Sequence, residues 1–214
     1  MTKIVATSDF HGNLPDIPPC DILIIAGDLC RGSNGADQSS WLDTKFRSWL
    51  EKVPAKEIVA IAGNHDHIFE TTPHLIPNNL KWHYLQDSFV VINSLTIFGT
   101  PWQLPFWGAF NLSDGRLEEI YKKIPQNTDI IISHGPPHGI KDEIYPKTSS
   151  KNSVIHTGST SLRKRVLEIK PKLCLFGHIH ESYGTHVEDG ITFANVSLVD
   201  DELKIAHEPM IFEI

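Results

Sequence analysis

Short apolar runs recur along this chain, and most of them end at a glycine, a serine or a residue whose side chain carries an oxygen or a ring nitrogen. Near-continuous apolar runs of this length are typical of strands in a sheet that is covered on both faces. The polar residue at the end of each run marks the point where the strand leaves the core. We therefore predict buried strands at residues 4–7, 22–26, 58–62, 130–132 and 173–176.

Between these runs, apolar side chains recur at helical spacing instead. In segment 38–52, residues such as Trp41 and Phe46 form one apolar face, and Ser39 or Ser40 is available as the N-terminal cap. Helices that alternate with strands indicate an α/β architecture. Two further helices are predicted on the same grounds at residues 113–123 and 159–169.

The C-terminal part of the chain has a different pattern. Three apolar segments, 184–187, 191–196 and 210–214, are predicted as strands, and Glu188-Asp189-Gly190 between the first two is typical of a hairpin turn. We expect a second, more antiparallel sheet in this part of the chain.

The bulk composition fits a single domain that covers residues 1–214. With 40% hydrophobic residues, a chain of this length can bury a substantial core without disulfides or structural metals. The formal net charge of -7 argues against an extended nucleic-acid surface, which usually carries a basic excess. Bound cations could still make one pocket locally positive, so a substrate that carries a phosphate is compatible with this charge.

The three cysteines, Cys20, Cys30 and Cys174, are scattered and include no Cys-x-x-Cys pair, which fits neither a disulfide framework nor a thiolate zinc site. The apolar segment near the first residue is too short for the core of a signal peptide. No apolar stretch is long enough to span a membrane. We therefore expect a cytoplasmic protein that has no membrane partner.

Clusters of carboxylate, amide and imidazole side chains follow the predicted strands. Because Phe10 separates Asp9 from His11, and Ile179 separates the histidines of the last cluster, alternation along an extended strand would point each pair to one side. All of these side chains could then reach one rim of a sheet. In chain order the clusters are Asp9-Phe10-His11, Gly27-Asp28, Gly63-Asn64-His65-Asp66, Ser133-His134-Gly135 and Gly177-His178-Ile179-His180.

These side chains form a suitable ligand set for metal ions. Imidazole, carboxylate and amide oxygen without thiolate fit Mn, Fe, Zn, Co or Ni better than they fit a structural zinc site. Any one of the clusters taken alone is more often a turn or a surface pair than a ligand. One site with two adjacent metal ions accounts for all five clusters together, so we favour that interpretation.

The order of the motifs resembles that of the calcineurin-like metallophosphoesterase superfamily, over nearly the whole chain. Segments 100–102, 107–111, 156–159 and 176–184 further resemble its metallophosphoesterase-domain-containing subfamily, which is sometimes linked to cyclic-nucleotide hydrolysis. The resemblance implies a four-layer α/β/β/α sandwich of two mixed sheets flanked by helices. It also implies two divalent or trivalent metal ions, with Mn favoured and Fe, Zn, Co or Ni as alternatives.

The resemblance assigns the metal ligands to two ions, with Asp28 as the bridge between them. Besides Asp28, the ligands of the first ion would be Asp9, His11 and His180, and those of the second ion would be Asn64, His134 and His178. Two such ions can clamp phosphoryl oxygens and convert a shared water into hydroxide near neutral pH, so that no protein nucleophile is required.

His65 follows a predicted metal ligand directly, so it is the best candidate to contact the phosphate and protonate the leaving oxygen. Related protein phosphatases carry an aspartate shortly after Gly-Asp that orients this histidine, whereas this chain has Cys30-Arg31 there. Asp66 or a backbone carbonyl could orient His65 instead. The difference makes a small diester a better substrate candidate than a phosphoprotein.

Three residues are predicted to contact the substrate: Asn64, Arg31 and His156. A guanidinium matches a phosphate in a bidentate way, although Arg31 fits a solvated loop equally well. The aromatic segment 102–110 fits core or interface packing, and it also fits a wall for nucleobase stacking or a dimer patch.

Taken together, the sequence favours a phosphodiesterase that acts on nucleotides or cyclic nucleotides through a metal-bridging hydroxide, with phosphomonoesters as a further substrate class. Two alternatives stay open. One is a non-catalytic module that keeps the fold and binds a protein, and the other is a nuclease.

Overall fold

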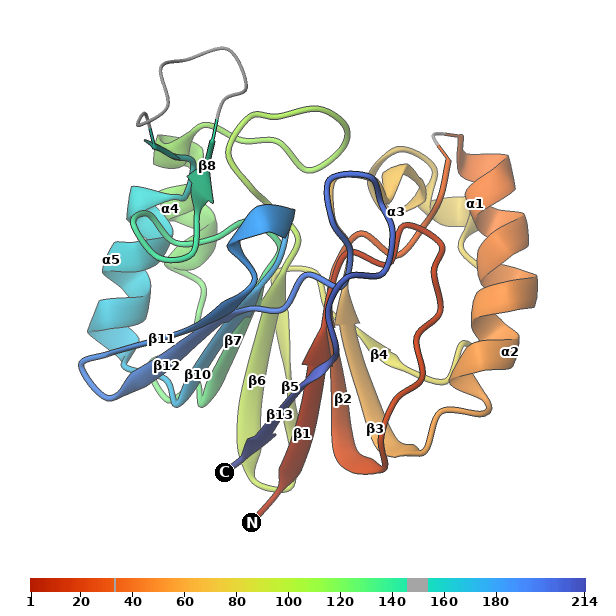
Figure 1. Cartoon of the computed structure of the whole chain (residues 1–214), viewed down its shortest axis with the longest axis horizontal. Coiled ribbons are helices and arrows are strands. Elements are labelled where there is room, and N and C mark those ends of the chain that lie inside the picture. Colours follow the sequence, from red (N-terminus) through yellow and green to blue (C-terminus); the bar gives the residue numbers. More distant parts are fainter. Residues whose placement is uncertain (33, 146–153) are drawn as a thin grey trace.

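Two β-sheets pack face to face, and helices cover their outer faces, in the computed structural model of this chain (Figure 1), which describes residues 1–32, 34–145 and 154–214. This arrangement is the four-layer α/β/β/α sandwich that the family resemblance implied. The first sheet contains five strands and the second contains six.

The first sheet is parallel except at one edge, where β13 runs antiparallel to β1. The three predicted N-terminal strands form its centre. In the order in which they lie in the sheet, the strands are β13 (Met210–Glu213), β1 (Lys3–Thr7), β2 (Cys20–Ala26), β3 (Ala55–Ile61) and β4 (His83–Tyr84).

The second sheet has four parallel central strands and an antiparallel strand at each edge. Its strands, in sheet order, are β11 (Gly184–Glu188), β12 (Ile191–Asn195), β10 (Leu173–Phe176), β7 (Ile130–Ser133), β6 (Leu95–Thr100) and β5 (Ser88–Ile92). A short pair, β8 (Glu143–Ile144) and β9 (Ile155–His156), lies outside both sheets.

The prediction of a separate C-terminal sheet was wrong. Strands β11 and β12 extend the sheet that already contains β10, while β13 pairs with β1 in the other sheet. A local pattern identifies a strand, but the neighbouring strand with which it pairs depends on contacts with residues far away in the sequence. In β13, Met210 and Phe212 pack against the core between the sheets. The predicted hairpin is confirmed, because Asp189 and Gly190 have φ angles of 52° and 80°, as a tight two-residue turn requires.

The apolar runs are continuous because both faces of the central strands are buried. Ile24 and Ile61 of the first sheet meet Ile132 and Leu175 of the second in the core between the sheets. The neighbouring Leu23 points to the opposite face, toward the helical layer. Successive side chains of a strand point to opposite faces of the sheet, and both faces are buried here. Apolar residues are therefore needed at every position.

One helical layer lies against the first sheet and contains α1 (Gly35–Trp41), a π-helical segment (Leu42–Phe46) and α2 (Arg47–Leu50) without interruption. The predicted cap at Ser39 or Ser40 was wrong. The helix begins earlier, where the Asn34 side chain accepts a hydrogen bond of 2.8 Å from the backbone N–H of Asp37.

The other layer contains α4 (Asp114–Tyr121) and α5 (Thr160–Ile169), which bury Leu117 and Val166 against the second sheet as predicted. Three short helical turns complete the fold at α3 (His67–Thr71), Pro73–Leu75 and His180–Ser182. None of the helices in the described ranges combines the length and apolarity needed to cross a membrane.

Candidate metal centre

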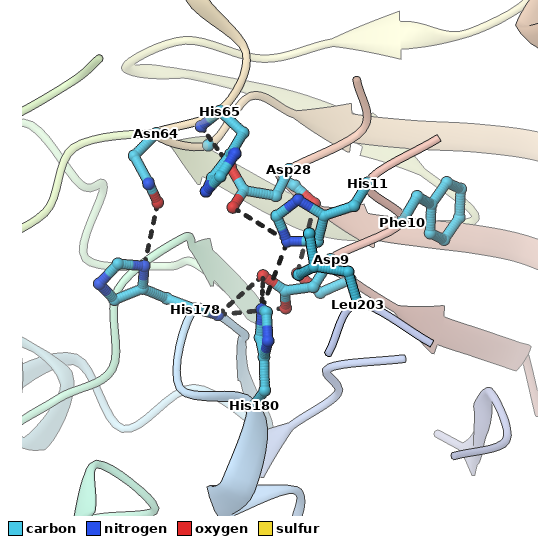
Figure 2. A network of polar contacts seen from close by, with 12 residues as sticks. Asp9, Phe10, His11, Asp28, Asn64, His65, His178, His180 and Leu203 are labelled. Carbon is cyan, nitrogen blue, oxygen red and sulfur yellow. Dashed lines mark hydrogen bonds and ion pairs between the residues drawn. The ribbon is translucent and has the colours of Figure 1, made fainter. Parts of the chain in front are cut away.

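The predicted ligands converge where β1, β2, β3, β7 and β10 end (Figure 2). The side chains form three overlapping groups, and within each group the donor atoms lie within 4.8 Å of one another. The groups are Asp9, His11 and His180; His11, Asp28 and His65; and Asp9, Asp28 and His134.

Sharp turns, rather than extended strands, aim the side chains. Asp9, His11, Asp28 and His178 all have left-handed backbone conformations, with φ of 56°, 44°, 53° and 71°. The prediction that alternation along a strand aligns each pair was therefore wrong, since β1 ends at Thr7 and β10 ends before His178. Such conformations are costly for residues other than glycine, and they cluster at functional sites.

Backbone hydrogen bonds hold these turns against one another. The N–H of Asp9 donates to the carbonyl of Gly27 at 3.0 Å, and the N–H of His11 donates to the carbonyl of Asp28 at 2.9 Å. A Cβ added at Gly63 would collide with the Asp28 carboxylate. The glycine in the third motif is therefore required by close packing beside a ligand.

Asp28 lies at the centre of the cluster. One of its carboxylate oxygens, Oδ2, lies 3.6 Å from Nε2 of His11, and the other, Oδ1, lies 3.4 Å from Nε2 of His134. Oδ1 also accepts a hydrogen bond of 2.8 Å from the backbone N–H of His65. The two oxygens of one buried carboxylate thus face two different groups of donor side chains.

On one side of Asp28, Asp9 and two histidines form the first set. The Nε2 atoms of His11 and His180 lie 3.3 Å apart, and Nε2 of His180 lies 3.5 Å from Oδ1 of Asp9. The carboxylate of Asp9 accepts a hydrogen bond of 2.8 Å from the Ser197 hydroxyl. Nδ1 of His180 lies 3.1 Å from the carbonyl of Asp200, which directs Nε2 toward the cluster.

On the other side, Asn64 joins two further histidines. Its Oδ1 lies 2.9 Å from Nε2 of His134 and 3.0 Å from Nδ1 of His178. Its Nδ2 donates to the carbonyl of Trp107 at 2.9 Å, so the amide oxygen is the atom that faces the histidines. Nδ1 of His134 lies 3.0 Å from the carbonyl of Ala26, an outer contact that orients the ring.

Charge pairs inside the cluster shift the ionisation of these groups. Burial alone would raise the pKa of Asp9 and of Asp28, but the neighbouring His180 and His134, respectively, outweigh it and hold both pKa values below the usual range. Burial opposes protonation of His134 and His180, yet their aspartate partners raise each pKa to about 9. A cation bound here would replace these two protons as the counter-charge of the carboxylates.

The donor set fits metal ions of borderline character. It consists of carboxylates, imidazoles and one amide oxygen, and the carboxylates and His134 are fully or almost fully buried. Burial and the charge of His134 lower the pKa of His178 to about 3, so this ring is neutral and able to bind a metal. Such ligands suit Mn, Fe, Zn, Co or Ni.

His65 lies beside the cluster with its ring edge-to-face against His11, and the ring centroids are 4.4 Å apart. Burial lowers its pKa. Within residues 1–32, 34–145 and 154–214, no hydrogen bond reaches the His65 ring.

Asp66, which was predicted to act with His65, contacts backbone instead. Its fully buried carboxylate accepts hydrogen bonds from the N–H groups of Leu29, Cys30 and Gly63 at 3.1, 2.8 and 2.8 Å. Burial, and then the charge of Asp28, raise its pKa to about 7. These bonds tie the turn after β2 to the turn after β3.

A cavity of about 450 Å³ opens beside the ligands. Asn64 and His65, which were predicted to contact the substrate, line it, whereas Arg31 and His156 are not among the described residues around it. Arg31 is exposed beside Gly12, and Nδ1 of His156 lies 2.7 Å from the buried Asp142 carboxylate.

The wall of the cavity contains residues that sequence reasoning did not single out, notably Ile144, Tyr145 and Thr157. Only the aromatic segment 102–110 gave a signal in the sequence. Phe110 is fully buried, as expected for core packing, while Phe106 is 69% exposed and faces the cavity.

Comparison with known proteins identifies the family. The calcineurin-like phosphoesterase family matches residues 2–182. The human metallophosphoesterase domain-containing protein 1 is 31% identical over all of this chain and 71% of its own length. A UPF0046 protein of Caenorhabditis elegans is 30% identical over 99% of this chain and 80% of its own length.

Solved structures share the fold. A phosphopantetheinyl hydrolase from Mycobacterium tuberculosis has a TM-score of 0.59 at 17% identity, over 94% of this chain and 90% of its own. The protein TT1561 of Thermus thermophilus has a TM-score of 0.59 at 15% identity, over 91% of this chain and 88% of its own. With this fold and a matching family profile over most of its length, the chain belongs to the calcineurin-like phosphoesterase family.

Proposed function

We propose that this protein is a dinuclear metal-dependent phosphodiesterase that hydrolyses nucleotides or cyclic nucleotides, with phosphomonoesters as a secondary substrate class. The observation that carries this proposal is the position of Asp28, whose two oxygens face two different ligand sets. In the proposal, Asp28 would contribute to holding both ions. Asp9, His11 and His180 would hold the first ion with it, and Asn64, His134 and His178 would hold the second.

Two bound ions, for which we favour Mn, would supply Lewis-acid chemistry and lower the pKa of water. The protein would supply the remaining steps. Asn64 and His65 line the cavity beside the ligands and would contact the phosphate. The ring of His65 would donate its proton to the leaving oxygen as the bond from phosphorus to that oxygen breaks.

The cavity supports a small organic phosphoester as the substrate. Its wall includes Leu104, Pro105, Phe106 and Pro136, so apolar surface adjoins the polar cluster. A flat base could stack on the exposed ring of Phe106, because aromatic faces accept any base. A formal net charge of -7 offers little attraction to a long nucleic acid, which favours a nucleotide over a polymer.

A substrate panel on metal-analysed protein tests this proposal. The panel contains 2′,3′- and 3′,5′-cyclic nucleotides, bis(p-nitrophenyl) phosphate and p-nitrophenyl phosphate, each assayed with Mn, Fe, Zn, Co and Ni. We expect turnover that a chelator abolishes and Mn restores, with cyclic nucleotides hydrolysed faster than the monoester. Absence of hydrolysis under all these conditions, together with stable capture of a protein partner, would instead support a non-catalytic interaction module.

A further inference from the structure

Hydrogen bonds among the described residues fix the backbone of His65 but not the orientation of its ring. Its peptide is anchored on both sides, because the N–H donates to Asp28 at 2.8 Å and the carbonyl accepts from Nε2 of Gln38 at 2.6 Å. The ring has no hydrogen-bond partner among the described residues. The nearest carboxylate in sequence, Asp66, accepts three backbone hydrogen bonds and links two turns.

Aromatic rings contact His65 instead. Trp107 lies with its ring centroid 4.9 Å from that of His65, at an interplanar angle of 54°. His11 contacts the same ring edge-to-face at 4.4 Å. Trp107 also packs edge-to-face on His67, at 5.3 Å, so it covers two neighbouring histidines.

The backbone around Trp107 is tied directly to the metal centre. The Trp107 carbonyl accepts the 2.9 Å hydrogen bond from Nδ2 of Asn64, and the N–H of Ala109 donates to the Asn64 carbonyl at 2.8 Å. Gly108, with φ of 95°, allows this approach, since a Cβ there would collide with the Asn64 carbonyl. The position of Trp107 is thus set by the same residue that is proposed to hold the second ion.

The exposure of Trp107 is informative as well. Its side chain remains 54% exposed, and it is not among the described residues that line the cavity. Full burial in a core therefore does not explain its placement, whereas its ring packs on the rings of His65 and His67.

We propose that Trp107 is a positioning residue for His65, whose ring it holds by aromatic packing where related phosphatases use a carboxylate. This inference rests on the proposed function, in which the oxygen of water forms the new bond to phosphorus and the bond to the leaving oxygen breaks. The proton of His65 passes to that leaving oxygen, and the proton lost by the water restores His65 through solvent. Trp107 contributes by keeping the donor within reach of the leaving oxygen.

The dependence on the leaving group separates positioning from general structural support. A p-nitrophenolate leaves without protonation, whereas the alkoxide of a nucleoside needs a proton. We expect Trp107→Ala to lower kcat for a 2′,3′-cyclic nucleotide about 10- to 100-fold, the range typical of residues that orient a functional group. The same variant should keep most of its kcat for bis(p-nitrophenyl) phosphate and a KM near that of the wild type.

Three further variants complete the experiment. Trp107→Phe keeps an aromatic face and should recover most of the lost kcat. His65→Ala should show the same dependence on the leaving group with a larger loss. Phe89→Ala removes a similarly exposed ring, 55% exposed on the edge strand β5, and should match the wild type.

Equal losses on both substrates, or loss of bound metal from Trp107→Ala, would overturn the inference, because either result would show general structural support. An unaltered Trp107→Ala enzyme beside a selectively impaired His65→Ala enzyme would overturn it too, while the proposed function would stand. If the wild type hydrolyses neither substrate with any metal, the proposed function itself fails.

Discussion

The proposed ligand cluster and the cavity wall share residues such as Asn64 and His178, yet they are built in different ways. Four of the proposed ligands, Asp9, His11, Asp28 and His178, follow strand ends in left-handed turns. Asp9, Asp28 and His134 are buried and tied to the backbone or to one another. The wall comes from loops, and Phe106 is 69% exposed. Holding metal ions requires donor atoms in a narrow range of positions, whereas recognising a substrate requires mainly a surface of suitable shape.

Removal of Asp28 should have the largest effect, because it would separate the two ligand sets. For Asp28→Ala we expect the metal content to fall and kcat/KM for bis(p-nitrophenyl) phosphate to drop on the order of 10³-fold, as for loss of a central electrostatic group. Metal analysis and steady-state kinetics measure both. Asp16→Ala, at an exposed position, serves as the control. Activity within a few fold of the wild type in Asp28→Ala would contradict the shared-ligand arrangement.

The pH dependence of metal affinity probes the same cluster. Because the pKa values of His134 and His180 are raised to about 9, both rings carry a proton in the metal-free protein at pH 7, and a cation must displace both. Below pH 9, each proton that the metal must displace lowers metal affinity about tenfold for every unit by which the pH falls. Because two protons are displaced, metal affinity should fall about 100-fold from pH 8 to pH 7.

Calorimetric titration of the metal-free protein with Mn, in buffers of different ionisation enthalpy, measures the affinity and counts the released protons. Because the pKa values of both histidines are raised, metal binding must tighten as the pH rises toward 9. An affinity that is the same at pH 7 and pH 8 would show that the two histidines are not protonated in the metal-free cluster.

Gly108 tests the contact between the two regions. Gly108→Ala would place a Cβ against the Asn64 carbonyl at a left-handed φ, and we expect a loss of about 2 kcal/mol in the free energy of unfolding together with weaker metal binding. Gly190→Ala is the matched control, since φ there is 80° but no atom lies within 4 Å of the added Cβ. Chemical denaturation compares the two; equal losses would mean that only backbone strain matters.

Phe106 tests the wall where its ring packs edge-to-face on the proposed ligand His178, with ring centroids 5.1 Å apart. Loss of base stacking costs about 1–3 kcal/mol, so Phe106→Ala should lower kcat/KM for a cyclic nucleotide about tenfold. The metal content should stay unchanged, because His178 keeps its contact with Asn64. Methyl phosphate esters, which carry no ring, should be hydrolysed as by the wild type. A loss of equal size for the methyl esters would argue against stacking.

The sequence predicted correctly those strands that a local pattern of apolar residues identifies. The strands that lead into the ligands are apolar at nearly every position, because both of their faces are buried. It missed β5 and β6, which pair with each other as a hairpin with Ile92 opposite Leu95. It also misassigned the partner of β13, because that strand pairs with β1 at the other end of the chain. It also attributed the alignment of Asp9 with His11 to an extended strand, whereas left-handed turns produce it.

The sequence by itself determined the types of donor atoms and their order, since each motif is a few residues long and directly follows a strand. Only the tertiary structure decided which oxygen of Asp28 faces which histidine, and that the Asn64 amide is turned by the Trp107 carbonyl. It also decided that the ring of Trp107 packs on His65. These relations join segments distant along the chain, and packing selects them through close contact and burial, which leave no local pattern.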